Sequence, residues 1–422
     1  MRRLPLVVFA LLSLVAAACG GDDADTADAD AGTGDDAPTT TTEAPTTTTE
    51  APESTTTTEA TTTTTTAPAL LEIVDVGLGA YPVGATTITV DDGVRDRPLT
   101  VEVWFPLDPS QEVTQEAHIY SFVTGDSYVS AHAVSADPAA AAADGPFPLV
   151  VYSHGSGGLR YIHSDYTETL ASHGYVVVAP DHTGNTAVEQ VLGIEADPLE
   201  IALDRPVDVT VVIDGVLAGA DAQSAPIAAL IDEESIAVTG HSFGGYTTYA
   251  VAAGKTFADT VIPADDRVDA LIPLAPAVGD GGEESLVTDA EFASIDLPTL
   301  ILVGTDDTTT PVDPNVERAW AASNASEHYR VELVAGAHQS FTDVCDYQDE
   351  VADLPDTNAI VVEFIEGYAL AGCQPDQMPI ERVKELTNTF AVAFLESVFR
   401  GGDMITAETH AIPDDVIFDA KS

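Results

Sequence analysis

Between residues 146 and 338 the sequence repeats one pattern, a short apolar run followed by a stretch with helical spacing. Each apolar run is nearly unbroken, which is typical of strands that are buried on both faces of a parallel sheet. This pattern predicts an α/β fold with a mostly parallel central sheet and helices on both faces. The predicted strands are 146–155, 175–182, 235–240, 268–276, 298–307 and 329–338, after an antiparallel start at 86–92 and 98–107; the predicted helices include 161–172, 203–219, 242–254 and 380–399.

Ligands of such sheets bind beyond the carboxyl ends of the strands, so the residues that follow each strand are informative. After the strand at 235–240 comes Gly240-His241-Ser242-Phe243-Gly244, which fits the pattern G-x-S-x-G. In that pattern a tight turn from strand to helix presents the serine hydroxyl above the sheet. A serine that caps a helix beside packing glycines would give the same letters. The pattern makes Ser242 a candidate nucleophile.

Two further strand ends carry the partners that a serine nucleophile needs. The strand near residue 300 ends in GTDDTTTP, where Asp307 has the favoured spacing and Asp306 is the competing carboxylate. The strand near residue 330 ends in AGAHQSF, with His338 at its tip. The order Ser242, Asp307, His338 is similar to that of α/β-hydrolase triads. We expect His338 to take the serine proton and Asp307 to fix the histidine tautomer.

The loop SHGSGG (153–158) follows another predicted strand, and we expect it to hold the oxyanion. The backbone N–H of Ser156 would act there together with the N–H of Phe243. We interpret His154 as a support of this loop.

Several other residues have two interpretations. His182 either lines the pocket or hydrogen-bonds the same loop. Arg205 and Asp208 are expected at the start of a helix, anchoring it by an ion pair rather than binding substrate. The segment 276–296, rich in Gly and Glu, is either a lid or a passive surface loop.

The N-terminal sequence predicts export. Residues 1–19, MRRLPLVVFALLSLVAAAC, have two arginines and then an uncharged run that is too short to span a membrane. The end AAAC resembles a bacterial lipoprotein signal, which implies a lipid on Cys19; the alternative is a plain signal peptide with Cys19 incidental. Residues 20–68 are acidic and threonine-rich, which predicts a disordered stalk. Residues 69–422 would then form the catalytic domain.

The chain is strongly acidic. Its 422 residues include 70 acidic and 14 basic ones, for a formal net charge of −56. The stalk holds 11 of the acids and the signal two of the bases, so the domain alone carries −47. This charge disfavours nucleic acid and anionic membranes as partners, and leaves the N-terminal lipid as the expected membrane contact. We interpret it as the bias of an acid-rich, salt-adapted proteome; attraction for cations is the alternative, but no acid cluster has a clear metal-loop spacing.

Besides Cys19, the chain has two cysteines, Cys345 and Cys373. Two thiols in an exported domain tend to pair, so we predict a disulfide, with two free thiols as the alternative.

The segment PFPLVVYSHGSGGLRYIHSDYTETLASHGYVVVAPDHTGNT (146–186), together with GHSFGG, RP-x-D at 205–208 and GAHQSFTDVC at 336–345, carries a family resemblance. It resembles the platelet-activating factor acetylhydrolase-like branch of the α/β-hydrolases, whose bacterial members are often named predicted dienelactone hydrolases. The likeness covers most of residues 70–400.

This resemblance implies the α/β-hydrolase fold, serine ester hydrolysis without metal or organic cofactor, and a triad of Ser242, Asp307 and His338. The chain departs from the family in two places. The turn has serine where true dienelactone hydrolases have cysteine, and Ser156 stands where the family often has an apolar residue.

The sequence thus favours a lipid-anchored or secreted bacterial ester hydrolase that acts on a small-molecule or lipid ester, with short-acyl or phospholipid-type esters expected. Polyester hydrolases share the same serine turn, so a polymer substrate is one alternative. A non-catalytic binding module on a hydrolase scaffold is another, although such a protein would be expected to have lost a triad residue.

Overall fold

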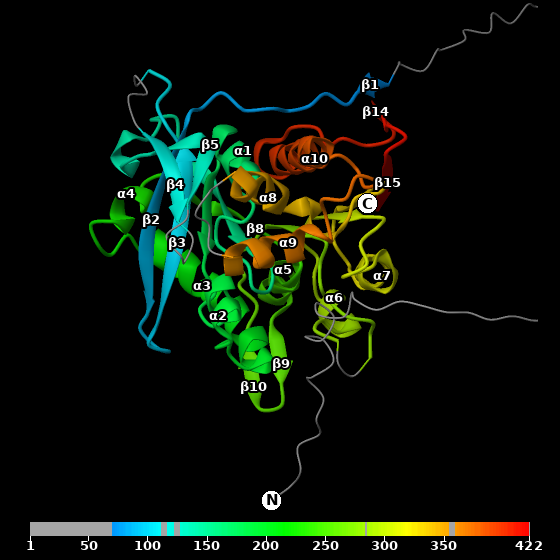
Figure 1. Cartoon of the computed structure of the whole chain (residues 1–422), viewed down its shortest axis with the longest axis horizontal. Helices are drawn as coiled ribbons and strands as arrows, with labels where there is room; N and C mark the ends of the chain where they lie inside the picture. The colour runs from blue at the N-terminus through cyan, green and yellow to red at the C-terminus, as the bar shows by residue number, and fades with distance from the viewer. Residues whose placement is uncertain (1–69, 111–115, 122–126, 283–284, 354–358, 422) are drawn as a thin grey trace, which may run out of the picture. The chain divides into compact units, whose positions relative to one another are not determined.

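A computed structural model describes residues 70–110, 116–121, 127–282, 285–353 and 359–421. Within them, the main sheet has eleven strands (Figure 1). From one edge to the other these are β15 (Val416–Lys421), β13 (His328–Leu333), β12 (Thr299–Gly304), β11 (Ala270–Leu274), β8 (Ile231–His241), β6 (Phe147–Ser153), β7 (Val176–Pro180), β3 (Arg97–Pro106), β2 (Val83–Asp92), β5 (Ser127–Ser135) and β4 (Ala117–Ser121).

The six strands from β13 to β7 run parallel to one another. β15 joins one side of this group and β3 the other, both antiparallel. The β2–β3 hairpin is the predicted antiparallel start. The prediction of a mostly parallel α/β sheet is therefore confirmed, and all the strands predicted from apolar runs are present.

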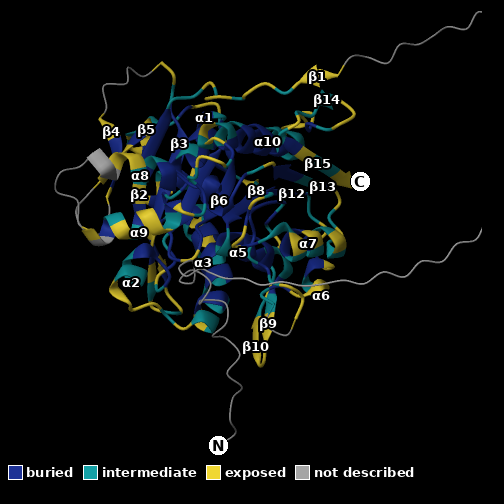
Figure 2. Ribbon diagram, turned by 45° about the vertical axis from the view of Figure 1, so that its right-hand side comes forward, coloured by how far each residue is buried: buried dark blue, intermediate teal, exposed yellow. Residues whose placement is uncertain are grey.

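Helices cover both faces of the sheet, and each face has its own apolar core. α1 (Ser164–Ser172) and α10 (Ile380–Arg400) pack on one face, and α3 (Pro198–Ala218) and α5 (Phe243–Ala253) on the other (Figure 1). Figure 2 shows the central strands as the buried interior between these layers. Such double coverage explains why β6, β7, β11 and β12 are almost entirely apolar.

The helix α3 begins earlier than its apolar spacing predicted. The Asp197 side chain accepts a hydrogen bond from the Leu199 N–H, and Pro198 occupies the first turn, where its missing N–H costs nothing. The helix ends at Gly219, which has a left-handed conformation. Arg205 and Asp208 therefore lie in the interior of α3, and the expectation that they begin a helix was wrong.

The remaining described elements are shorter or peripheral. A two-stranded ladder joins β1 (Leu71–Glu72) to β14 (His410–Ala411), and β9 (Lys255–Phe257) pairs with β10 (Thr260–Ile262). The other helices are α2 (Ala187–Leu192), α4 (Ser224–Ala228), α6 (Asp289–Phe292), α7 (Glu317–Ala322), α8 (Val344–Asp353) and α9 (Ala359–Ala369).

Among the described residues, no helix is both long and apolar enough to cross a membrane. The predicted signal at 1–19, including Cys19, and the stalk at 20–68 lie outside the described residues.

Candidate active site

Ser242 occupies a strained turn between β8 and α5. Its φ of 56° and ψ of −115° are rare for a residue with a side chain, and such strain is concentrated at functional sites. The glycines on both sides let the turn pack against β6. A Cβ on Gly240 would lie 2.5 Å from the Ser153 carbonyl oxygen, and one on Gly244 would lie 1.8 Å from the same atom. The turn has the geometry expected of a nucleophile elbow.

Hydrogen bonds join Ser242 to residues at two other strand ends. His338 follows β13, and its Nε2 lies 2.9 Å from Ser242 Oγ. Its Nδ1 lies 2.7 Å from Oδ2 of Asp307, which follows β12. His338 and Asp307 are buried, whereas Asp306 is exposed and contacts Thr305 instead. Of the two competing carboxylates, Asp307 is the one that contacts the histidine.

The surroundings of Asp307 keep its carboxylate ionised. Its Oδ1 accepts hydrogen bonds from the N–H groups of Thr309 (2.9 Å) and Thr310 (2.7 Å). Burial acts to raise the pKa of the Asp307 carboxyl, but the His338 imidazole and these hydrogen bonds outweigh it and lower that pKa. The Thr310 hydroxyl also lies 2.9 Å from Asp307 Oδ2 and 3.1 Å from His338 Nδ1. Thr310 was not predicted, because it belongs to a threonine run that is typical of an ordinary turn.

His241 supports the backbone of the histidine loop, the segment 334–341 that carries His338. Its Nε2 lies 2.8 Å from the His338 carbonyl oxygen, and the two ring centroids are 4.6 Å apart. Burial and the charge of His338 lower the pKa of His241 to about 3. The ring is therefore neutral near pH 7 and donates its Nε2–H to the carbonyl. In the sequence, His241 was only the variable position of G-x-S-x-G.

The predicted oxyanion donors lie on the two segments that meet at Ser242. Phe243 is the first residue of α5, and within the described residues neither its N–H nor that of Ser156 has a hydrogen-bond partner. The loop 153–158 passes directly beside the serine, since a Cβ on Gly155 would lie 3.4 Å from Ser242 Cβ. Two unpaired N–H groups near a Ser–His–Asp contact are the arrangement that stabilises a tetrahedral oxyanion.

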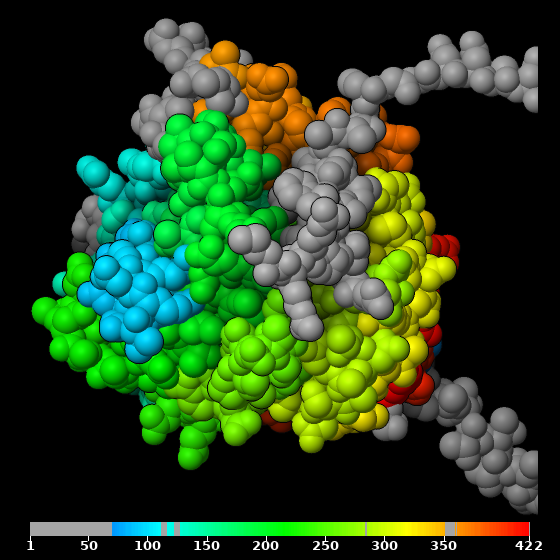
Figure 3. All heavy atoms as spheres, turned by 90° about the horizontal axis from the view of Figure 1, so that it is seen from below, coloured from blue at the N-terminus to red at the C-terminus, as the bar shows by residue number. Residues whose placement is uncertain are grey.

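Residues of α9 and of the region around α2 also contact the loop 153–158. The Tyr368 hydroxyl, on α9, lies 3.1 Å from the Ser156 carbonyl oxygen and 2.8 Å from Gln190 Oε1, on α2. Asn185 Nδ2 donates to Ser156 Oγ at 3.1 Å. Figure 3 shows the green surface around α2 against the orange surface around α9 on this side of the molecule. Nothing in the sequence around Tyr368 marked it, because its neighbours follow no motif.

His154 and His182 support the loop from below. The backbone N–H of His182 donates to His154 Nε2 at 3.1 Å. His154 therefore carries its proton on Nδ1, which donates to the Gly155 carbonyl oxygen at 2.7 Å. The His182 ring is fully buried between Ser153 Oγ and Asp208 Oδ2. Of the two interpretations of His182, the structure favours loop support.

The expected ion pair at Arg205 and Asp208 is only half right. Asp208 pairs with Arg95 at 2.7 Å and with Arg97 at 3.0 Å. Within the described residues Arg205 forms no ion pair, and its guanidinium donates to backbone carbonyls instead. The prediction failed because the carboxylate of Asp208 is already shared by two arginines from the β2–β3 hairpin and by His182.

The segment 276–296 is anchored where it is described. The N–H groups of Val278 and Gly279 donate to Asn315 Oδ1, and Arg318 Nη1 donates to the Gly279 carbonyl oxygen at 2.8 Å. Phe292 is fully buried. These contacts favour the passive-loop interpretation; residues 283–284 lie outside the described residues.

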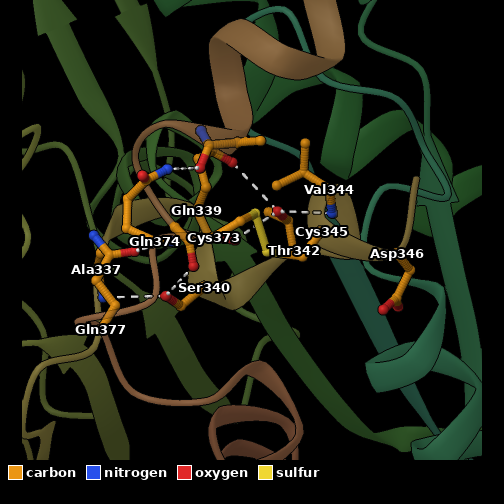
Figure 4. The surroundings of a disulfide bond; sticks show 12 residues. Ala337, Gln339, Ser340, Thr342, Val344, Cys345, Asp346, Cys373, Gln374 and Gln377 are labelled. Atoms are coloured by element: carbon orange, nitrogen blue, oxygen red, sulfur yellow. Dashed lines mark hydrogen bonds between the residues drawn. A yellow bond between two sulfur atoms is a disulfide. The ribbon is translucent and has the colours of Figure 1, made fainter. Parts of the chain in front are cut away.

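Cys345 and Cys373 form the predicted disulfide. It joins the first turn of α8 to the segment after α9, close to the histidine loop (Figure 4). Gln339 N–H donates to the Ala371 carbonyl oxygen, and Ser340 Oγ donates to the Gly372 carbonyl oxygen. The bridge therefore fastens the stretch of chain that holds His338 in place.

Comparisons with known proteins relate the chain to ester hydrolases. The family described as platelet-activating factor acetylhydrolase, isoform II, matches residues 121–196, and the PET hydrolase-like family matches residues 159–350. A solved ferulic acid esterase from Streptomyces cinnamoneus has a TM-score of 0.58 and 25% sequence identity, over 83% of this chain and 99% of that one. The chain belongs to the α/β-hydrolase serine esterases. As a member, this esterase is a carboxylic ester hydrolase, as the resemblance implied.

Proposed function

We propose that this esterase hydrolyses short-acyl carboxylic esters, phospholipid-type esters among them, through an acyl-enzyme on Ser242. The observation that carries the proposal is the continuous contact from Asp307 through His338 to Ser242, at the edge where the parallel strands end. That edge is where ligands of open α/β sheets bind.

The reaction follows from these contacts. His338 Nε2 removes the Ser242 proton as Oγ attacks the ester carbonyl, and the N–H groups of Ser156 and Phe243 hold the resulting oxyanion. The imidazolium returns the proton to the alcohol oxygen, the C–O bond breaks, and the acyl group stays on Ser242. Water, deprotonated by the same histidine, then releases the acid. Asp307 remains ionised throughout and stabilises the imidazolium.

We place the enzyme outside the cytoplasm, held to the membrane by a lipid on Cys19. The apolar run before Cys19 and the threonine-rich stalk after it support this placement. The domain charge of −47 opposes direct contact with an anionic surface and disfavours anionic substrates. Mass spectrometry of the membrane fraction tests the anchor: a diacylated Cys19 is expected, and an unmodified N-terminus on a released protein would exclude it.

The substrate class is tested with p-nitrophenyl esters from acetate to palmitate, on the wild type and on Ser242→Ala. We expect kcat/KM to be highest for the short esters, and the variant to lose nearly all activity. A fluorophosphonate probe should label the wild type only. An unlabelled, inactive wild type would instead support the non-catalytic binding module.

A polyester is the second candidate substrate, and the match of residues 159–350 to the PET hydrolase-like family favours it. Incubation of the wild type and Ser242→Ala with a polyester film separates the candidates. Soluble monomer released by the wild type alone would support a polymer substrate. Hydrolysis of soluble esters without any release from the film would exclude it.

A further inference from the structure

Arg205 is a buried cation beneath the loop 153–158. Its side chain is fully buried on α3. Nη1 donates to the His154 carbonyl oxygen at 2.6 Å, and Nη2 donates to the Gly155 carbonyl oxygen at 3.0 Å. These are consecutive carbonyls of the loop, so one planar guanidinium holds two neighbouring peptide groups.

This contact determines where the loop's N–H groups point. In a trans peptide the C=O and the following N–H are antiparallel. Because the Gly155 carbonyl points at Arg205, the N–H of Ser156 points away from it. The Gly155 carbonyl oxygen also accepts hydrogen bonds from the Gly158 N–H (3.1 Å) and from His154 Nδ1 (2.7 Å). Three donors on one oxygen leave this peptide plane little freedom to turn.

The same guanidinium reaches the second oxyanion donor. Its Cζ lies 5.0 Å from the centre of the Phe243 ring, which is within the range of a cation–π contact. Phe243 is the first residue of α5, so fixing its side chain also restrains the N–H that follows Ser242. Arg205 thus contacts both segments that supply an expected oxyanion donor.

No direct ion pair holds the charge of Arg205, although the nearby Asp208 carboxylate acts to raise its pKa. Within the described residues no carboxylate lies within 4.0 Å of this guanidinium, and its Nε has no hydrogen-bond partner. A buried cation without a direct ionic partner still costs stability, and packing alone does not offset that cost. Burial lowers the pKa of Arg205 to about 9, which leaves it charged near pH 7. A positive charge behind the two carbonyls also polarises their peptide groups and strengthens the N–H donors on the far side.

We propose that Arg205 is a positioning residue for the oxyanion hole, holding the N–H groups of Ser156 and Phe243 ready for the tetrahedral intermediate. It touches no substrate and acts through the backbone. The inference rests on the proposed function, because it presupposes that Ser242 is the nucleophile.

Arg400 provides a matched control. It donates to the consecutive carbonyls of His173 (2.9 Å) and Gly174 (2.6 Å), and its Cζ lies 4.4 Å from the Tyr175 ring centre. It therefore makes the same kind of clasp, but before β7, at the opposite end of the strands from Ser242.

The experiment compares full-length wild type with Arg205→Met, Arg205→Lys and Arg400→Met. The readouts are kcat and KM for p-nitrophenyl acetate, and the inhibition constants of a trifluoromethyl ketone and of a non-reactive amide analogue. The ketone is captured as a tetrahedral oxyanion, and the amide reports only ground-state binding. Circular dichroism and thermal melting show whether each variant is folded.

We expect Arg205→Met to lower kcat about 100-fold, which is the effect of losing one oxyanion donor, and to raise KM less than about threefold. Affinity for the ketone should fall in parallel with kcat, whereas affinity for the amide should stay constant. Arg205→Lys keeps the charge but not the two-pronged contact, and should lie between. Arg400→Met should melt earlier but keep kcat.

Three outcomes would overturn the inference. A folded Arg205→Met with unchanged kcat would do so, as would a variant that loses ketone and amide affinity equally. If Arg205→Met does not fold, a folded Arg205→Lys with wild-type kcat and ketone affinity would overturn it. The proposed function fails separately: a wild type that neither hydrolyses the ester nor binds the ketone would refute the role of Ser242 itself.

Discussion

At Ser242 the backbone carries strain that the surrounding glycines make possible. A positive φ is unfavourable for serine. It persists because the tight packing of the turn between β8 and α5 against β6 fixes the backbone there. The strain lowers the stability of the fold, but it places the Ser242 hydroxyl within hydrogen-bonding distance of His338. The contacts among Ser242, Asp307 and His338 were predictable, because motifs fix the spacing of these residues.

Other site residues were not predictable because their roles depend on contacts between distant segments. Thr310 and His241 act on His338 through the folded geometry of two loops. The sequence favours an ion pair between Arg205 and Asp208, which lie close together along the chain. Only the structure shows that Arg95 and Arg97 form the ion pairs with Asp208 instead.

Asp307 and Asp306 form a natural pair of test positions. Asp307→Asn should lower kcat by roughly 10³–10⁴-fold, because an amide favours the wrong histidine tautomer. Asp306→Asn should keep the wild-type kcat, since that side chain is exposed and does not contact His338. Steady-state hydrolysis of p-nitrophenyl acetate measures both. Equal losses in the two variants would contradict the assignment of Asp307.

Asp343 makes stability depend on pH. Burial raises the pKa of its carboxyl well above the usual value, and the charges of Asp165 and Asp346 add to this, while Lys384 and a hydrogen bond from Ser164 oppose it. A raised folded pKa means that the folded state binds the proton more tightly than the unfolded chain. The stability from this group is therefore fully present at low pH. This stability is lost as the pH rises from about 4, near the unfolded pKa, through the folded pKa. The loss is about 1.4 kcal/mol for each pH unit that separates the two pKa values.

The variant Asp343→Asn removes this titration and keeps the size of the side chain. The free energy of unfolding in urea should fall less between pH 5 and pH 8 in the variant than in the wild type. Other buried carboxyls contribute equally to both proteins and cancel in the comparison. Parallel pH profiles would show that Asp343 does not titrate in this range.

At the scale of the elements, the pattern of apolar residues predicts the central strands but not β4 and β5 at one edge of the sheet. The parallel strands are apolar runs because both of their faces are covered. β4 and β5 expose alternate residues, and their sequences, AHIYS and SYVSAHAVS, mix small, polar and aromatic residues. Alternation this short is weak evidence for a strand. β5 is held in the sheet by pairing with β2, and β4 by pairing with β5, and no local sequence pattern records either contact.

The disulfide between Cys345 and Cys373 stabilises the segment that carries His338. Replacing both cysteines by serine should lower the free energy of unfolding by about 3–4 kcal/mol, because the closed loop spans 28 positions. Thermal melting with and without dithiothreitol measures this. The reductant should lower the melting temperature of the wild type and leave the double variant unchanged. A reductant-insensitive wild type would contradict the bridge.

For the whole molecule, charge is the dominant long-range force. A net charge of −47 on the domain produces self-repulsion that salt screens, whereas buried pairs such as Asp208 with Arg97 are screened little. Raising NaCl from about 0.05 to about 1 M should therefore raise the melting temperature by about 1–3 °C, corresponding to ~1–2 kcal/mol. Chloride is preferred to sulfate because sulfate also strengthens apolar burial. A falling melting temperature would show that attractive surface pairs outweigh the repulsion.

Acyl transfer to Ser242 is the step on which the rest of the mechanism depends, and its product can be trapped. Full-length wild type is mixed with p-nitrophenyl acetate, quenched in acid within milliseconds and analysed by intact and peptide mass spectrometry. We expect a burst of p-nitrophenolate equal to the enzyme present and one acetyl group, on Ser242. An acetyl group on another residue, or a Ser242→Ala variant that hydrolyses the ester as fast as the wild type, would contradict the mechanism.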